Sequence, residues 1–179
     1  MKKVLVTLIA LSLPTFALAD ATKGFYVQAD AGHATVKGDA SVKGFSPRIT
    51  AGYDFGDFRV AADYTHYKSK KINTSLVDAE AKYHSAGVSA IYDFDLQAPV
   101  KPYVGARVAV NHASTKVETA NSYYERKETK TGIGAMAGVS YEVTPNVALD
   151  AGYRYNYWGK FDETKIHTHE VSAGVRVTF

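Results

Sequence analysis

The chain has 179 residues, with 21 lysines and arginines against 18 aspartates and glutamates, and it contains no cysteine. This near balance of charge excludes the strongly basic surface that nucleic-acid binding requires. The lack of cysteine excludes disulfides and thiolate metal sites, so the fold must depend on sheet hydrogen bonds and side-chain packing.

The first residues have the three parts of a secretory signal peptide. Two lysines follow the first methionine, residues 4–13 form an apolar run, and residues 17–19 (Ala-Leu-Ala) offer a small-x-small cleavage site. The apolar run is too short for a membrane helix, which needs ~20 residues. We therefore expect a signal peptide over 1–19 and one mature domain over 20–179.

After the signal, apolar and polar side chains alternate in eight segments. Alternation with period two is typical of β-strands that have two different faces. The apolar faces span residues 25–31, 45–53, 58–64, 86–92, 104–110, 133–141, 147–157 and 171–179. A barrel strand needs only ~9–11 residues to cross a membrane, so these segments predict an all-β, eight-stranded antiparallel transmembrane barrel in which the last strand pairs with the first.

The connections between the segments alternate between long and short. The long ones are 35–44, 68–82, 112–130 and 159–167, and the short ones are 54–57, 95–102 and 144–146. This alternation predicts short turns on the periplasmic side and four longer loops on the extracellular side of an outer membrane.

Aromatic residues collect near the ends of the segments. Examples are Tyr53, Phe58 and Tyr64, together with Tyr67 and the run 153–158, which ends on Trp158. A soluble sandwich would place aromatic side chains in mid-strand to fill its core, whereas an outer-membrane barrel places them in girdles at both interfaces. We expect all of these residues to belong to such girdles.

Charged residues also occur within the segments, on the side opposite the apolar face. They are Asp30, Arg48, Arg59, Asp63, Arg107, Asp150, Arg154, Glu170 and Arg176. A basic residue facing lipid near the midplane costs ~2–4 kcal/mol, so we expect these side chains to pair in an Arg–carboxylate network inside the barrel. A soluble lipocalin-like barrel is the alternative, but the opposite face, rich in Ala and Val, suits lipid contact better than a ligand cavity.

The six histidines give little evidence of a metal site. Only His167 and His169, two residues apart on one strand face, have a ligand-like spacing, and no second acid-rich cluster accompanies them. We predict no metal and no cofactor, and we place the histidines at the membrane interface or in loops.

Catalytic motifs are also missing from the sequence. It contains no Gly-x-Ser-x-Gly motif, phosphate loop or dinucleotide fingerprint. His66, Asp78 and Ser114 offer residue types that an outer-rim enzyme acting on lipid or peptide would use, so that function is kept as the alternative to a non-enzymatic protein.

The second and third long loops are the candidate binding surface. Their candidate residues are Lys68, Lys70, Lys71, Lys116, Tyr123, Tyr124, Arg126 and Lys127. Exposed tyrosine and arginine dominate protein-binding hot spots, which favours a protein partner. The other interpretation is a solvated loop whose lysines and arginines meet lipopolysaccharide phosphates.

Motifs spread over nearly the whole chain, except the loops 68–82 and 112–130, resemble the opacity (Opa) family of porin-like outer-membrane barrels. They include Gly24-Phe-Tyr-Val-Gln-Ala-Asp, Lys43-Gly-Phe-Ser-Pro-Arg-Ile, Ser89-Ala-Ile-Tyr-Asp-Phe-Asp, Leu149-Asp-Ala-Gly-Tyr-Arg-Tyr-Asn-Tyr and the ending Val171-Ser-Ala-Gly-Val-Arg-Val-Thr-Phe.

The resemblance implies a surface antigen whose extracellular loops bind host components, as an adhesin or by binding a complement regulator. It also implies that Phe179 is the C-terminal aromatic signal recognised by the barrel assembly machinery. We expect a monomer in contact with outer-membrane lipid and lipopolysaccharide. A purely structural membrane protein without a host partner is a further alternative.

Overall fold

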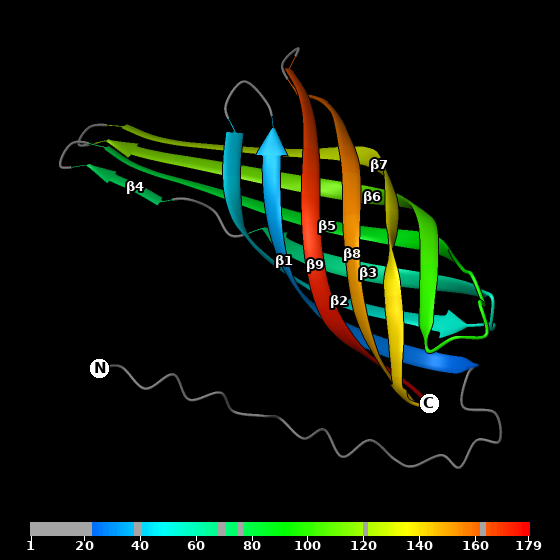
Figure 1. Ribbon diagram of the computed structural model, residues 1–179. Coiled ribbons are helices and arrows are strands. Elements are labelled where there is room, and N and C mark those ends of the chain that lie inside the picture. Colours follow the sequence, from blue (N-terminus) through cyan, green and yellow to red (C-terminus); the bar gives the residue numbers. More distant parts are fainter. Residues whose placement is uncertain (1–22, 38–40, 68–70, 75–76, 120–121, 162–163) are drawn as a thin grey trace, which may run out of the picture.

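The structure is a computed structural model, and it describes residues 23–37, 41–67, 71–74, 77–119, 122–161 and 164–179. These residues form one antiparallel sheet (Figure 1) with strands β1 (Gly24–Lys37), β2 (Ser41–Asp54), β3 (Phe58–Tyr67), β4 (Lys71–Thr74), β5 (Val77–Asp93), β6 (Val100–Thr119), β7 (Ser122–Thr144), β8 (Val147–Phe161) and β9 (Thr164–Thr178). In this part of the chain, no helix is long and apolar enough to cross a membrane. The predicted signal peptide, 1–19, lies outside the described residues.

Eight of the strands close into a barrel. Strand β3 pairs with β5, and β1 pairs with β9 from Tyr26 opposite Thr178 to Lys37 opposite His167. The short strand β4 lies outside this circle and pairs only with β5 among the described strands. Each wall strand therefore has a partner on both sides, and the predicted pairing of the first and last strands is confirmed.

The two faces of the wall are inverted relative to a soluble protein. Large apolar side chains point outward, with Phe25, Ile49 and Val171 each more than 60% exposed. The inward positions alternate with them and carry glycine, serine and charged residues, as in β3, whose residues alternate strictly between exposed and buried except at His66. An apolar outward face of this kind has a low free energy in contact with hydrocarbon and a high free energy in contact with water.

Glycine on the inward face makes room for the charged side chains. A Cβ atom added at Gly87 would lie 2.7 Å from the Arg107 guanidinium, and one added at Gly174 would lie 2.4 Å from an oxygen of Asp30. Small residues therefore occupy the positions opposite the longest inward side chains, which allows a narrow barrel to hold them.

Short turns connect the strands at one end of the barrel, here called the turn rim (55–57, 94–99 and 145–146). Asp54 accepts a hydrogen bond from the Gly56 amide at 2.8 Å, and the Thr144 hydroxyl accepts one from the Val147 amide at 3.0 Å. Gly56 has φ 108°, a conformation that a side chain would strain. Both tight turns lie where the sequence predicts them.

At the opposite end, here called the loop rim, the strands extend further than predicted. Strands β5, β6 and β7 continue past the barrel as a ribbon, with Val77 opposite Thr119 and Thr119 opposite Ser122 (Figure 1, green strands). The four longer connections are present, but 35–44, 68–82, 112–130 and 159–167 are strand over much of their length. The prediction treated polar sequence beyond ~10 residues as loop, whereas a strand that leaves the membrane can continue in water with polar residues on both faces.

The girdle predicted from the aromatic residues is wrong for Tyr67 and Trp158. They are only 3% and 1% exposed and pack inside the barrel, with ring centroids 5.4 Å apart. The reason is the parity of the residue number along the strand. Even-numbered residues of β8, such as Arg154 and Asn156, face inward, and Trp158 continues that series. The expected girdle residues Tyr53, Phe58 and Tyr64 do lie on the outward face.

Candidate functional site

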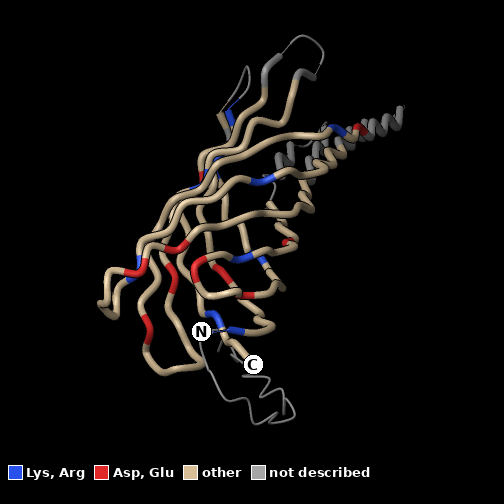
Figure 2. Tube along the Cα trace, turned by 90° about the vertical axis from the view of Figure 1, so that its right-hand side faces the viewer, with Lys and Arg blue, Asp and Glu red and all other residues tan. Residues whose placement is uncertain are grey.

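The middle of the barrel is filled by charged side chains from several strands. All nine charged residues predicted for the interior are 7% exposed or less, namely Asp30, Arg48, Arg59, Asp63, Arg107, Asp150, Arg154, Glu170 and Arg176. Figure 2 shows lysine and arginine beside aspartate and glutamate on neighbouring strands of the barrel. We call these residues, with Asp54 and Asp93, the interior network.

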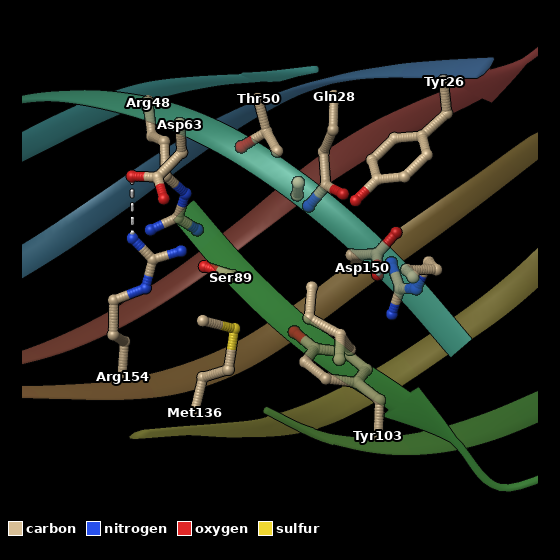
Figure 3. A pocket seen from close by; sticks show the side chains of 13 residues that line it. Tyr26, Gln28, Arg48, Thr50, Asp63, Ser89, Tyr103, Met136, Asp150 and Arg154 are labelled. Atoms are coloured by element: carbon tan, nitrogen blue, oxygen red, sulfur yellow. Dashed lines mark hydrogen bonds and ion pairs between the residues drawn. The ribbon is translucent and has the colours of Figure 1, made fainter. Parts of the chain in front are cut away.

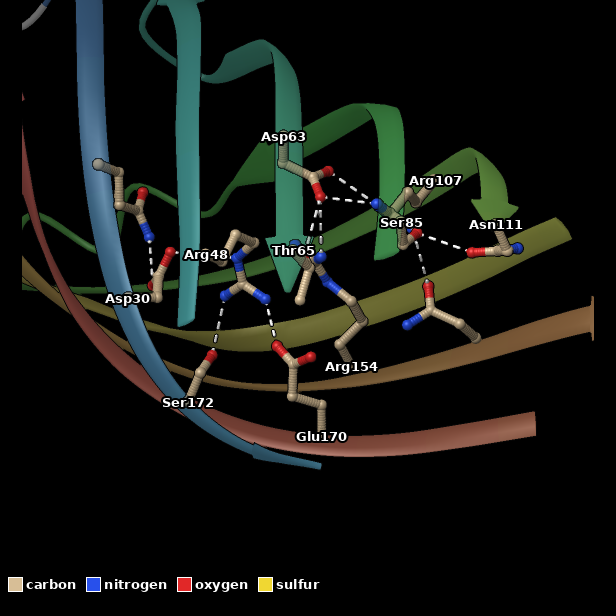
Figure 4. Close-up of polar contacts among 12 residues, drawn as sticks. Asp30, Arg48, Asp63, Thr65, Ser85, Arg107, Asn111, Arg154, Glu170 and Ser172 are labelled. Carbon is tan, nitrogen blue, oxygen red and sulfur yellow. Dashed lines mark hydrogen bonds and ion pairs between the residues drawn. The ribbon is translucent and has the colours of Figure 1, made fainter. Parts of the chain in front are cut away.

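Asp63 on β3 is the centre of the network (Figure 4). Arg107 donates to both of its oxygens, from Nε at 2.8 Å and from Nη2 at 2.6 Å, while Arg154 approaches Oδ1 at 3.3 Å. The Arg107 guanidinium also donates to the Ser85 hydroxyl at 3.1 Å, which in turn donates to Asn111 at 2.7 Å. One carboxylate is therefore shared by two buried guanidinium groups.

Arg48 on β2 contacts two other strands near Asp63. Its guanidinium donates to Asp30 on β1 at 3.1 Å, to Glu170 on β9, and to the Ser172 hydroxyl at 2.9 Å (Figure 4). Because β1 and β9 are the first and last wall strands, these contacts join the two strands that close the barrel.

Nearer the turn rim, the network contains two acidic residues that the sequence analysis did not place in it. Asp93 accepts two hydrogen bonds from Arg59, at 2.6 and 2.7 Å, and Asp54 accepts one from Arg176 at 3.0 Å. Asp93 already lay on the polar face of its segment, so its parity was the available signal. Asp54 was assigned to a turn, although it ends β2 with its side chain buried.

Aromatic and apolar side chains fill the space between the charged pairs. The Arg59 guanidinium lies 5.2 Å from the centroid of the Tyr103 ring, and Ile91 packs with Tyr26 and Met136. The remaining cavity (Figure 3) has a volume of about 30 Å³, the space of about one water molecule. This part of the barrel is a packed interior and does not contain an open channel.

The loop-rim end of the interior is closed by an aromatic cluster. Trp158 packs against Tyr67 and lies 6.2 Å, centroid to centroid, from Tyr83, with Ala34 and Ile166 beside them. The turn-rim end is wider, with a vestibule of about 210 Å³. There Lys101 donates to Glu142 at 2.7 Å, and this hydrogen bond raises the pKa of the lysine.

Five of the eight candidate binding residues lie in the loop-rim ribbon. Lys68 and Lys70 fall outside the described residues, and Lys71 begins β4. Lys116 lies on β6 directly opposite Glu125 on β7, and the β7 positions Tyr123, Tyr124, Arg126 and Lys127 are paired with residues 114–118 of β6. With Lys71 opposite Glu80 and Glu80 opposite Lys116, positions of alternating charge type cross four strands in one row. Opposite charges at facing positions favour this register.

The residues considered for an enzyme are not brought together as a catalytic group. His66 points outward on β3 and pairs with His84. Ser114 lies on β6 opposite Lys82, and the Asp78 position is four residues before Lys82 on β5. Within the described residues, no group of three or more histidines and acidic residues is arranged to hold a metal ion.

A closed antiparallel barrel with an apolar outer face, a charged interior and longer connections at one rim is a transmembrane barrel of the outer membrane of a Gram-negative bacterium. Solved structures of this class resemble it. The crystal structure of Neisserial surface protein A is 54% identical, covers 87% of this chain and 97% of its own, and gives a TM-score of 0.75. Ail, the attachment invasion locus protein of Yersinia pestis, is 23% identical and shares the fold, with a TM-score of 0.60 over 86% of this chain and 99% of its own.

The model of the Opacity family porin protein matches residues 51–179. Opacity protein opA58 of Neisseria gonorrhoeae is 36% identical over 184 aligned positions, which cover 74% of this chain and 71% of that protein. The chain therefore belongs to the Opacity family. The turn rim accordingly faces the periplasm, and the loop rim faces the outside of the cell.

Proposed function

We propose that this protein is a non-enzymatic surface protein whose loop-rim ribbon binds a host component, as an adhesin or as a binder of a complement regulator. The observation that carries the proposal is the continuation of β5, β6 and β7 beyond the wall, since a barrel that served only as a membrane structure would gain nothing from it. The ribbon presents tyrosine, arginine and lysine positions, the residue types favoured in protein-binding hot spots. Membership of the Opacity family supports the same function.

The register gives a clean way to test this. Ala113 on β6 lies opposite Glu128 on β7, so residues 114–127 can be replaced by Asn-Gly, which closes a two-residue hairpin between facing positions. We expect whole cells carrying this variant to lose binding to the host protein, measured with a purified complement regulator and with cultured host cells.

A matched control shortens a second hairpin of the loop rim, between β8 and β9. Gly159 on β8 lies opposite Ile166 on β9, and residues 160–165 can be replaced in the same way. Both variants should migrate on gels as folded barrels, with a mobility shift on boiling. Host binding that persists without 114–127, in a barrel shown to be folded, would refute the assignment to the ribbon.

We also infer that residues 1–19 are removed on export, that Phe179 is read by the barrel assembly machinery, and that the barrel works as a monomer. The aromatic side chain follows directly after β9, and the Phe179 amide donates to the Phe25 carbonyl at 2.8 Å, beside the seam of the barrel. Deletion of Phe179 should reduce the amount of folded barrel in the outer membrane without changing the heat-induced mobility shift of the molecules that do fold.

A further inference from the structure

All six histidines of the chain lie on the outward face of the barrel. They are His33 on β1, His66 on β3, His84 on β5, His112 on β6, and His167 and His169 on β9, and each alternates with inward neighbours such as Gly32, Thr65, Ser85, Asn111 and Thr168. None belongs to the interior network. A residue type placed so consistently on one face calls for an explanation in terms of what that face contacts.

Five of these histidines mark the same level of the wall. On the turn-rim side of each, the next four outward residues of the strand are apolar or tyrosine, as in Phe25, Val27, Ala29 and Ala31 before His33. The same holds on the turn-rim side of His66, His84, His112 and His169, where the apolar residues precede His66 and His112 and follow His84 and His169 in the chain. His66 lies directly opposite His84, and His84 directly opposite His112. We call His33, His66, His84, His112 and His169 the histidine belt. It lies where the apolar band ends at the loop rim.

The charge around the belt has one sign. Lys37 and Lys43 are exposed on the outward face just beyond it, on β1 and β2. Among the described side chains, no carboxylate lies on the outward face of any strand, because every described aspartate and glutamate faces the interior or lies in a turn. Among the side chains that the structure describes, the outer edge of the apolar band therefore presents groups that can be cationic and no carboxylate.

Several contacts of the histidines are with polar, uncharged groups, and one is with a lysine. The Nδ1 atom of His84 lies 3.1 Å from Nδ1 of His66 and 2.7 Å from the Tyr64 hydroxyl, and His112 lies 2.9 Å from the Thr129 hydroxyl. His169 contacts His167 and the rings of Tyr153 and Tyr155, with Lys37 near enough to interact electrostatically. His33 has the apolar cross-strand partners Phe45 and Val171.

We propose that the histidine belt binds the phosphate groups of the outer-leaflet glycolipid, and that it does so more tightly as the pH falls from neutral to mildly acidic. A protonated imidazole donates two N–H groups and carries a charge, so it binds a phosphate oxygen more strongly than the neutral ring. Histidine is the side chain whose charge ordinarily changes in this pH range. The proposal does not depend on host binding.

The short distance between His66 and His84 couples protonation of the belt to phosphate binding. Two imidazolium rings with nitrogens 3.1 Å apart repel each other, and a phosphate oxygen between or above the rings offsets this repulsion. Protonation and phosphate binding should therefore promote each other.

The test measures which lipids contact the barrel in phosphatidylcholine vesicles. A spin-labelled, phosphorylated lipid A is compared with spin-labelled phosphatidylcholine, and the relative association constant is followed from about pH 7.5 to about pH 5.5. For the unchanged protein we expect that constant to rise about fivefold, the effect of one additional charge near a lipid surface. In a variant with all five belt histidines changed to glutamine the rise should vanish. That variant also gives the baseline, since the phosphate itself gains a proton in the same range.

Two controls separate the belt from other causes. The variant K37Q/K43Q should bind the phosphorylated lipid less at every pH and keep the pH-dependent rise. Lipid A without phosphates should show no rise with the unchanged protein. The proposal is overturned if the rise persists in the five-histidine variant, if it persists with dephosphorylated lipid, or if acidification increases binding only of a soluble sulfated glycan and not of the lipid. A boiling-dependent gel shift checks that each variant is folded.

Discussion

At the scale of single residues, each inward charge of this barrel depends on a specific partner, and loss of that partner leaves an uncompensated charge in the packed interior. Asp63 has the most demanding position, since it accepts hydrogen bonds from Arg107 and lies 3.3 Å from Arg154. Removing its charge leaves two guanidinium groups in a packed interior with too little negative charge nearby.

We predict that Asp63→Asn lowers the free energy of unfolding by ~3–5 kcal/mol, the usual cost of breaking a buried ion pair from one side. Urea unfolding in lipid vesicles, followed by tryptophan fluorescence, measures this. Asp57→Asn is the matched control, because Asp57 is exposed in a turn, and it should stay within ~0.5 kcal/mol of the unchanged protein. Equal unfolding curves for the two variants would show that the network contributes little.

At the scale of the strands, parity decides what each side chain contacts. The alternation of apolar and polar residues was sufficient to predict the eight wall strands, their faces and the seam between the first and last. It also contained the correct positions of Tyr67 and Trp158, which an argument from aromatic clustering placed at the wrong surface. The length of the ribbon could not be predicted from the sequence, because polar residues are equally compatible with a loop and with a strand in water. Asp54 shows the same limit at a strand end.

Parity on β8 gives a direct prediction. Trp158 points inward against Tyr67 and Tyr83, whereas Tyr155, three residues earlier, points outward and is 36% exposed. Trp158→Ala should destabilise the barrel by ~3–5 kcal/mol because it leaves a cavity in a buried cluster. Tyr155→Ala should cost much less, since lipid chains can fill the space. Thermal unfolding followed by the gel mobility shift compares the two, and equal losses would contradict the inward placement of Trp158.

The whole molecule is a closed wall around a filled centre. From the turn rim inward, the interior passes from an open vestibule of about 210 Å³ to the interior network with a cavity of about 30 Å³, and then to the aromatic cluster of Tyr67 and Trp158. The same arginine–carboxylate contacts that hold β1, β2, β3, β6, β8 and β9 together also occupy the path that a solute would take. Stability and closure are therefore two consequences of one set of contacts.

It follows that the barrel should not conduct ions. In planar lipid bilayers we expect the unchanged protein to give no stepwise conductance at neutral pH, because the cavity among Asp63, Arg48 and Arg154 holds only about one water. The triple variant D63A/R107A/R154A removes three side chains from the centre of the interior network while keeping the net charge change to one unit, and it should produce small, frequent conductance steps. Its control is the variant V88A/V108A/V110A, which removes volume from the outward face of β5 and β6 and should remain silent. Regular conductance from the unchanged protein would show that the interior network moves aside in the membrane, and silence from the interior variant would show that the aromatic cluster alone closes the barrel.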